Sequence, residues 1–465
     1  MKFKSILVIF STLLLVFTTG IYAQSDEPSP PESLTGVQLN DAAAFDGLTL
    51  FAPLISQHIY LINLEGDVVK SWDLEANVAT SQEPYLLPNG NLLVQTGANS
   101  SMLPLFGQVG GVAGGLKEYS WDGDLLWSYD YAGDTYQQHH DIEPLPNGNI
   151  LLVAWEVITA EEALALGMLP DRIPEGDTVW PDHVAEIDPQ TNEIVWRWRV
   201  WDHLIQDTDP NLPNYGVISE HPERIDINYV GPQQRLGDWQ HINSIDYNPQ
   251  LDQIILSSRN FSEIWIIDHS TTVEEAAGST GGNSGMGGDL LYRWGNPVTY
   301  QAGTAEDQTL FYQHDAQWID PGLPGAGNIL LFNNGDDTQE SHRYSTALEI
   351  VPPMLADGTY SHEDNAYAAS EIVWEYRADP PESFFAPYVS SVQRLPNGNT
   401  LIVNGTGGRF IEVTPSGELV WDYVNGFTGS MPEGTPYFSA TSVFRALRYT
   451  PDYSGFSALV TASLP

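Results

Sequence analysis

The sequence LPNGNLLV at residues 87–94 recurs as LPNGNILL at residues 145–152 and as LPNGNTLI at residues 395–402. An Asn-Gly pair between apolar residues is a strong short-range signal for a β-hairpin, because the tight turn needs residues that tolerate positive φ. Looser copies of the same element begin at Asn248 and Pro324. The chain therefore carries a repeated turn that joins short strands.

A second repeated element is a later strand that carries tryptophan. It occurs around Trp72, Trp127, Trp196, Trp294, Trp374 and Trp421. Short strands that recur with an aromatic signature are typical of propellers and solenoids. The long, variable loops 202–237 and 271–287 favour a propeller, and we expect the tryptophans to pack between its blades.

Five turns and six tryptophan strands leave one blade incomplete. The segment FRALRY at residues 444–449 has the character of the missing inner strand, which would join residues 48–51 and the next two N-terminal strands. Such closure removes exposed sheet edges. We predict an all-β fold: a six-bladed β-propeller with four-stranded blades over residues 37–465, closed by strands from both ends of the chain.

The N-terminus has the layout of a signal peptide. A short basic start precedes an almost wholly apolar run at residues 6–17 and a small, polar segment that ends near Ala23. We expect residues 1–23 to be removed, residues 24–36 to form a polar linker, and the mature chain to be periplasmic or secreted without a membrane span. Loss of Lys2 and Lys4 would change the net charge from −44 to −46.

The composition excludes several classes of function. The chain has 61 acidic and 17 basic residues, so it lacks the basic surface that nucleic acids or anionic lipids require. We therefore expect no nucleic-acid partner. It has no cysteine, which excludes thiolate catalysis, iron–sulfur clusters and cysteine-bound zinc.

Three histidines stand at equivalent places in consecutive repeats. His140, His241 and His314 each lie shortly before a turn element, near the start of the first strand of a blade. Arg259 follows His241 by 18 residues, the length of one hairpin out and back. With Asn243, these polar groups should converge on one rim of the central channel.

The residue types in this set indicate the kind of ligand. Three convergent histidines could hold a metal ion. A guanidinium nearby opposes a dication, however, and with Asn243 it favours an anion with several oxygens, such as sulfate, phosphate or carboxylate. We therefore predict neither a metal nor a cofactor.

The sequences QHHD at residues 138–141, QHINS at 240–244 with Arg259 downstream, and QHDA at 313–316 resemble the bacterial aryl-sulfate sulfotransferase family. That resemblance implies transfer of a sulfuryl group from a phenolic sulfate donor to a phenol acceptor. The transfer would be independent of PAPS, with a ping-pong mechanism through a sulfohistidine.

The resemblance also assigns roles. His314 matches the nucleophile, while His140, His241, Asn243 and Arg259 match groups around the sulfuryl. It further implies a sulfuryl contact for Thr406. The enterobacterial members carry an N-terminal β-sandwich domain and a cysteine pair, neither of which is expected here. Their dimer contacts and substrate preferences therefore do not carry over, and a homodimer is left open.

Three other functions compete with this interpretation. A non-catalytic ligand-binding or scaffold propeller is one, because a fold does not determine a function. A quinoprotein-type dehydrogenase is a second, since those propellers also repeat tryptophan, but many carry a vicinal disulfide that this chain cannot form. A metal-dependent hydrolase built on the three histidines is the third.

Overall fold

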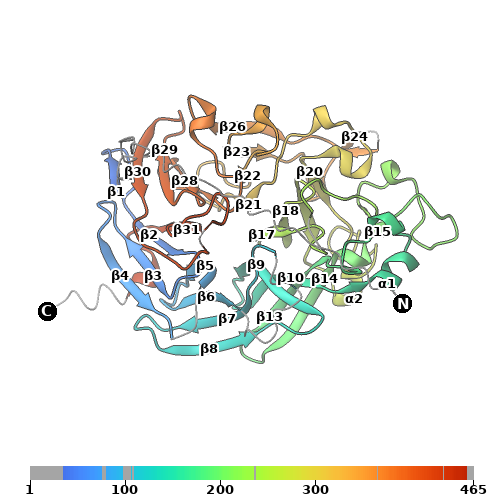
Figure 1. Cartoon of the computed structure of the whole chain (residues 1–465), viewed down its shortest axis with the longest axis horizontal. Helices are drawn as coiled ribbons and strands as arrows, with labels where there is room; N and C mark the ends of the chain where they lie inside the picture. The colour runs from blue at the N-terminus through green and yellow to red at the C-terminus, as the bar shows by residue number, and fades with distance from the viewer. Residues whose placement is uncertain are drawn as a thin grey trace, which may run out of the picture. The chain divides into compact units, whose positions relative to one another are not determined.

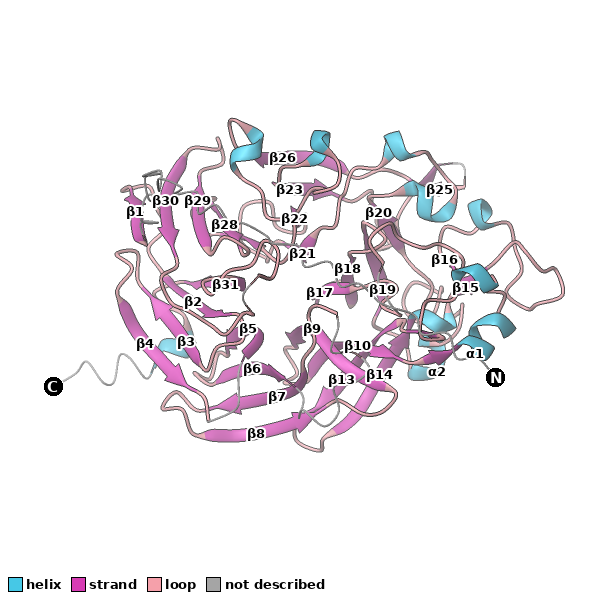
Figure 2. Ribbon diagram, viewed as in Figure 1, coloured by secondary structure: helices cyan, strands magenta, loops and turns pink. Residues whose placement is uncertain are grey.

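Six antiparallel sheets follow one another around a ring in the computed structural model (Figures 1 and 2). The structure describes residues 35–75, 80–97, 106, 109–234, 237–363, 365–432 and 434–457. The predicted signal peptide and residues 24–34 of the predicted linker lie outside the described residues. The ring confirms the predicted six-bladed β-propeller.

The blades are numbered here in chain order, and within each the strands run from the channel outward. Blade 1 contains β31 (Val443–Tyr449), β2 (Leu48–Pro53), β3 (His58–Ile62) and β4 (Val68–Asp73). Blade 2 contains β5 (Thr80–Leu86), β6 (Leu92–Gly97), β7 (Gly114–Tyr119) and β8 (Leu125–Asp130). Blade 3 contains β9 (Tyr136–Pro144), β10 (Ile150–Glu156), β13 (Asp182–Asp188) and β14 (Glu193–Arg199).

The second half of the ring is built in the same way. Blade 4 contains β17 (Ile242–Asn248), β18 (Gln253–Ser258), β19 (Glu263–Asp268) and β20 (Tyr292–Trp294). Blade 5 contains β21 (His314–Trp318), β22 (Ile329–Asn333), β23 (Thr346–Val351) and β26 (Glu371–Arg377). Blade 6 contains β27 (Ser391–Arg394), β28 (Thr400–Asn404), β29 (Arg409–Val413), β30 (Leu419–Val424) and β1 (Gly36–Asn40).

The loops between blade strands contain small elements of their own. Three two-stranded sheets pair β11 (Ile158–Thr159) with β12 (Thr178–Val179), β15 (Leu204–Ile205) with β16 (Ile225–Asp226), and β24 (His362–Glu363) with β25 (Ala366–Tyr367). The helices are α1 (Ala160–Ala165) and α2 (Val273–Ala276). Single 3-10 turns cover Pro170–Arg172, Val200–Asp202, Ile218–Glu220, Pro297–Tyr300, Ala305–Asp307, Glu340–His342, Pro381–Ser383 and Ser454–Phe456.

The ends of the chain close the ring as predicted, with one addition. β31 is the inner strand of blade 1 and pairs antiparallel with β2, so that Leu447 lies opposite Leu50. β1 adds a fifth strand to blade 6 by pairing with β30. The prediction of four strands in every blade was therefore wrong for blade 6. β1 is short and mostly exposed, so its sequence carries no repeat signature.

The repeated aromatic residue of the outer strand bonds each blade to the next. The indole N–H groups donate as follows: Trp72 to the Trp121 carbonyl, Trp127 to Asn192 Oδ1, Trp196 to Thr271 Oγ1, Trp374 to the Pro415 carbonyl, and Trp421 to the Leu64 carbonyl. Each acceptor belongs to the turn between the third and fourth strands of the following blade. The tryptophans thus join neighbouring blades through hydrogen bonds as well as through packing.

In blade 4 the bonding residue is a tyrosine. Tyr292 lies opposite Ile266 of β19 and takes the position of the indole. It is hydrogen-bonded to the Ser370 hydroxyl at 2.8 Å and to the Ala368 carbonyl at 3.1 Å in blade 5. Trp294, which the sequence pattern placed in the repeat, lies two residues further along the same face.

The repeated Pro-Asn-Gly-Asn turn also forms a hydrogen bond to the sheet of its own blade. Gly90, Gly148 and Gly398 have φ between 85° and 90°, the left-handed conformation that the hairpin predicted. The last Asn of this turn, and Asn328 at the end of the looser copy, donates to a glutamate on the third strand of its own blade. These amide donors and carboxylate acceptors pair as Asn91 with Glu118, Asn149 with Glu186, Asn328 with Glu349, and Asn399 with Glu412, at 2.5–2.6 Å.

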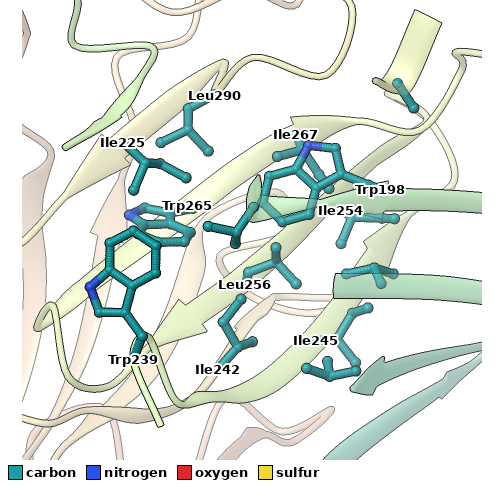
Figure 3. Packing of buried hydrophobic residues seen from close by; sticks show 14 of the residues in the cluster. Trp198, Ile225, Trp239, Ile242, Ile245, Ile254, Leu256, Trp265, Ile267 and Leu290 are labelled. Atoms are coloured by element: carbon teal, nitrogen blue, oxygen red, sulfur yellow. The ribbon is translucent and has the colours of Figure 1, made fainter. Parts of the chain in front are cut away.

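The hydrophobic core consists of clusters that lie between adjacent blades. Figure 3 shows the one between blades 3 and 4, where Trp198 of β14 faces Ile254 and Ile267 of blade 4. Equivalent clusters fill the other inter-blade spaces. Because both faces of these sheets are covered, strands such as β10, β18 and β19 are buried along almost their whole length, with no alternation of buried and exposed residues.

A buried arginine links the inner strands across the channel. Arg445 of β31 contacts Glu83 of β5 at 2.7 Å, Asp141 of β9 at 2.7 Å and Asp315 of β21 at 3.1 Å. It also donates to the backbone carbonyl of Asn243 in β17 at 3.2 Å. Asp315 in turn accepts from the Val392 amide of β27 at 2.7 Å. The network therefore connects the inner strands of all six blades.

Replacing Arg445 with methionine should destabilise the fold by about 3–5 kcal/mol near neutral pH, because three buried carboxylates lose their cation. Part of this loss should return as the pH falls, since burial raises the pKa of Glu83 and Asp315, and protonated carboxyls need no counter-charge. Urea unfolding followed by tryptophan fluorescence measures both effects.

Arg377 supplies the matched control, because it lies on the outer strand β26 with an exposed side chain. Arg377→Met should change the free energy of unfolding by less than about 0.5 kcal/mol. Equal stability of the two variants would contradict the role given to Arg445.

Candidate active site

The three predicted histidines lie at the same end of three neighbouring inner strands. His140 lies within β9, His241 immediately precedes β17, and His314 is the first residue of β21. Arg259 directly follows β18, the strand that pairs with β17. Because the start of one antiparallel strand lies beside the end of its partner, all four residues belong to one rim of the channel.

Each of these inner strands carries a β-bulge near its start, where its pairing register with the second strand shifts. A bulge adds a residue to one strand and turns its side chains in new directions. His140 and His241 have φ of 50° and 54°, a left-handed conformation that is uncommon away from glycine. The backbone is thus strained at the residues whose side chains meet at the rim.

The structure brings the imidazoles together. The rings of His140 and His241 meet edge to face with centroids 4.3 Å apart. Phe444 of β31 lies beside both His140 and His314, at 6.2 Å and 6.5 Å between ring centroids. His140 and His314 are buried, whereas His241 is partly exposed. The predicted convergence of these three histidines is therefore present in the fold.

A hydrogen bond fixes one nitrogen of His314. Its Nδ1 lies 2.8 Å from Asn334 Oδ1 and 3.1 Å from the Tyr312 carbonyl. Both partners accept hydrogen bonds, so Nδ1 carries the proton of the neutral ring. The lone pair of His314 is therefore on Nε2.

Arg259 is a buried cation with no ion pair to a carboxylate of the described residues. Its guanidinium lies between the rings of Tyr312 and Tyr388, 4.9 Å and 5.1 Å from their centroids. It donates to the amide oxygens of Gln233 at 2.9 Å and Asn260 at 3.2 Å, and its Nε has no partner among the described residues. A buried, unpaired guanidinium is costly unless an anion completes it.

Asn243 and Thr406 are placed differently from the histidines. The Asn243 amide donates to the Gln313 carbonyl at 2.8 Å, and its Oδ1 is buried without a partner in the described part of the chain. It thus fixes the residue that precedes His314. Thr406 donates to Asn404 Oδ1 at 3.1 Å, and its carbonyl accepts from Ser442. No hydrogen bond found among the described residues joins Thr406 to the histidines.

Several residues around the rim carry no signal in the sequence. Asp238 holds His241 Nδ1 at 2.5 Å and also accepts from the Trp155 indole at 3.0 Å. Gly111 packs directly over the His140 ring, where a Cβ would come within 2.1 Å of Nε2. These contacts arise from loops and bulges, so sequence spacing alone does not reveal them.

His139 is not among the predicted site residues, and the structure shows it in direct contact with His140. Its ring stacks on Trp155 at 3.9 Å and its Nδ1 lies 2.8 Å from His140 Nδ1. The tandem His-His pair in the sequence was the signal that could have indicated this.

Burial and neighbouring charges keep two of the imidazoles neutral. Burial lowers the pKa of His314 well below its ordinary value, and the Arg259 cation lowers it further. Burial also lowers the pKa of His140, with added contributions from His241, His139, His314 and Arg259. The rim therefore combines neutral nitrogen bases with a fixed positive charge, which suits attack on an anionic, multi-oxygen group.

Three observations concern other parts of the described chain. Among the described residues, no three His, Asp or Glu side chains are arranged to hold a metal ion, and no helix is long and apolar enough to cross a membrane. A cavity of about 590 Å³ lies elsewhere, between inserted loops, and is lined by residues that include Trp201, Tyr215, Arg224 and Asp289. None of the predicted site residues lines it.

Sequence comparisons relate the chain to known proteins. A sequence model of the family described as Arylsulfotransferase (ASST) matches residues 86–421. The arylsulfate sulfotransferase AssT of Escherichia coli O6:H1 is 25% identical over 323 residues, which are 62% of this chain and 49% of that protein. The protein of the same name from Lelliottia amnigena is 23% identical over 315 residues, 60% of this chain and 48% of that protein.

The chain thus spans about half the length of these curated relatives. Among solved structures, a protein of unknown function from Bacteroides caccae aligns with a TM-score of 0.46 and 14% identity, over 87% of this chain and 100% of that one. The family match covers most of the propeller and includes His140, His241, Asn243, Arg259, His314 and Thr406. The chain belongs to the arylsulfotransferase family.

Proposed function

We propose that this protein transfers a sulfuryl group from a phenolic sulfate ester to a phenol, without PAPS, by a ping-pong mechanism through a sulfohistidine at His314. The observation that carries the proposal is the convergence of three imidazoles and a buried guanidinium that no carboxylate neutralises among the described residues. Family membership supports the same chemistry.

In the first half-reaction His314 acts as the nucleophile. Its Nε2 lone pair attacks sulfur, the bond between sulfur and the phenolic oxygen breaks, and the oxygen leaves with the electron pair. In the second, the acceptor phenol attacks the same sulfur and the N–S pair returns to Nε2. Dividing the transfer into two steps in this way is covalent catalysis. The Asn334 bond holds the tautomer and orientation that this attack needs.

Charge develops on the sulfuryl oxygens and on the leaving oxygen. Arg259 would donate to the former, and its guanidinium has no ion pair to a carboxylate of the described residues that would compete. His140 or His241 would exchange a proton with the phenol oxygen. Asn243 and Thr406 complete the proposed sulfuryl contacts, as the family resemblance implies.

The proposal extends to partners and location. The substrates are a small phenolic sulfate and a small phenol, and no nucleic acid is required. We propose that residues 1–23 direct export, so that the enzyme works in the periplasm or outside the cell. Amino-terminal sequencing of protein purified from the periplasm or medium of an expressing culture tests this point.

A short pulse of 4-nitrophenyl sulfate without acceptor should leave a sulfo group on the peptide that contains His314, because nothing then removes it. Peptide mass spectrometry detects the adduct, and addition of phenol should discharge it. His314→Ala should abolish both release of nitrophenol and the adduct.

His342 offers the control, since its ring stacks on Phe311 outside the cluster. His342→Ala should retain the adduct. An adduct on another residue, or a fully active His314→Ala enzyme, would overturn the assignment. If the natural protein binds the aryl sulfate but does not convert it, a non-catalytic propeller is favoured.

Arg259→Ala should lower kcat/KM by about 10²–10³, the usual effect of removing one donor from a developing oxyanion. Arg259→Lys should lose less activity, because lysine keeps the charge but lacks the planar fork that holds two oxygens. Steady-state kinetics with Arg377→Lys as the surface control measures the difference. Wild-type kcat/KM in Arg259→Ala would contradict the role of the guanidinium.

The attack step should be independent of pH between about pH 8 and about pH 6, because His314 stays neutral below the ordinary histidine pKa of about 6.5. Arg259→Met removes a cation that lowers this pKa, so the acidic fall in kcat/KM should move to higher pH. Rates of nitrophenol release across pH give both profiles. If kcat/KM falls at the same acidic pH in Arg259→Met as in the natural protein, Arg259 does not act on the pKa of His314.

A further inference from the structure

A chain of three buried groups extends from His140 into the protein. His140 Nδ1 lies 2.8 Å from His139 Nδ1, and His139 Nε2 lies 2.7 Å from Asp182 Oδ1. The three residues are 3%, 0% and 0% exposed, so water does not compete for these contacts. His140 thereby joins the rim of the channel to a buried carboxyl.

The contact between the two imidazoles restricts their tautomers. Two Nδ1 atoms at 2.8 Å need one proton between them, so one ring donates and the other accepts. If His139 donates, His140 carries its own proton on Nε2, toward the site. If His140 donates, its Nε2 holds a lone pair. The choice follows from whether the Asp182 carboxyl holds a proton.

The contact between His139 and Asp182 departs from ideal hydrogen-bond angles. Neither His139 Nε2 nor Asp182 Oδ1 has another partner among the described residues, and 2.7 Å leaves no room for a group between them. The other carboxylate oxygen lies 3.4 Å from the Ile242 amide. Stacking on Trp155 fixes the plane of the His139 ring.

His241 has a different environment. Its Nδ1 is held by Asp238 at 2.5 Å, and that carboxylate also accepts from the Trp155 indole. With its Nδ1 held by that carboxylate, His241 lacks the link to a second buried imidazole that His140 has through His139.

We propose that His140 is the general acid and base of the reaction, and that His139 and Asp182 are positioning residues that relay its proton to and from the interior. The proposal rests on the proposed sulfuryl transfer and names the group that handles the phenol proton. It predicts that Asp182 holds the proton in the resting enzyme and is ionised between the two half-reactions.

The proton is conserved over the cycle. In the donor step His140 Nε2–H gives its proton to the leaving phenol oxygen, His139 Nδ1–H gives its proton to His140 Nδ1, and Asp182 gives its proton to His139 Nε2. The acceptor step runs in reverse: the phenol proton goes to His140 Nε2 and a proton returns to Asp182. Both rings stay neutral throughout.

The surrounding charges favour this neutral route. His241, His139, His314 and Arg259 all disfavour a cationic His140, with burial as the larger cause of its lowered pKa. Burial, the larger cause, and the Asp238 charge raise the pKa of the Asp182 carboxyl, whereas the His241 side chain and the backbone amides of His241 and Ile242 lower it; the net direction is upward. A neutral carboxylic acid is thus favoured in the resting state, which is the form that begins the cycle.

Leaving-group dependence tests the relay. In Asp182→Asn and His139→Gln, the rate with 4-methylphenyl sulfate should fall about 10²-fold or more, because its phenoxide needs a proton. The rate with 4-nitrophenyl sulfate should fall less than about tenfold, because that phenoxide leaves unprotonated. The ratio of the two rates on one preparation is independent of the folded fraction.

His183 supplies the matched control. It is the neighbour of Asp182, is equally buried, and bonds instead to the Tyr131 hydroxyl at 2.8 Å. His183→Gln should leave the ratio of the two rates unchanged. Equal losses with both donors in Asp182→Asn and His139→Gln would overturn the relay and leave these residues a purely structural role.

Nitrogen NMR of histidine-labelled protein gives a second readout that needs no turnover. As the pH rises, Asp182 should lose its proton and His140 should change from the Nε2–H to the Nδ1–H tautomer without passing through the imidazolium. This change should be absent in Asp182→Asn. If the natural protein forms no sulfo adduct, the proposed function fails, and the NMR titration then tests the relay by itself. Titration of His140 to an ordinary imidazolium would refute the relay.

Discussion

The bonds of Arg445 hold the ring and the candidate site together. Its guanidinium meets carboxylates from β5, β9 and β21 and a carbonyl from β17, while Asp315 extends the network to β27. The residues that precede these contacts face the rim: His140 before Asp141, His314 before Asp315, and Phe444 before Arg445. The constraint that fixes the inner strands therefore also fixes the imidazoles, so the geometry of the site follows from that of the channel.

The features of the fold and the site that depend on the repeat could be predicted from the sequence. The hairpin turns, the closing strand near Phe444 and the shared level of the three histidines all follow from strand periodicity and turn chemistry. β1 could not be predicted, because a short exposed edge strand needs no distinctive residues. Tyr292 was missed for a related reason: its hydroxyl performs the bonding of an indole, and the pattern followed tryptophan.

The contacts around the histidines lie beyond what spacing can predict. A bulge shifts side chains by one residue, so whether His139 or His140 faces the rim is decided by local backbone conformation. Asp182 and Asp238 come from the third strand of blade 3 and from a long loop. The three imidazoles consequently have distinct partners: an amide for His314, a carboxylate for His241 and a second imidazole for His140. The partner of His314 suits a nucleophile, and the partner of His140 suits a proton carrier.

The central claim is that one sulfuryl group sits among His140, His241, Arg259 and His314. A crystal structure of the His314→Asn variant with a bound aryl sulfate tests it most directly, because the nucleophile is absent and the ester persists. The account predicts the sulfate tetrahedron at the rim, with oxygens on the Arg259 guanidinium and the phenolic oxygen next to His140. A sulfate bound elsewhere, for example in the cavity beside Trp201 and Arg224, would contradict it.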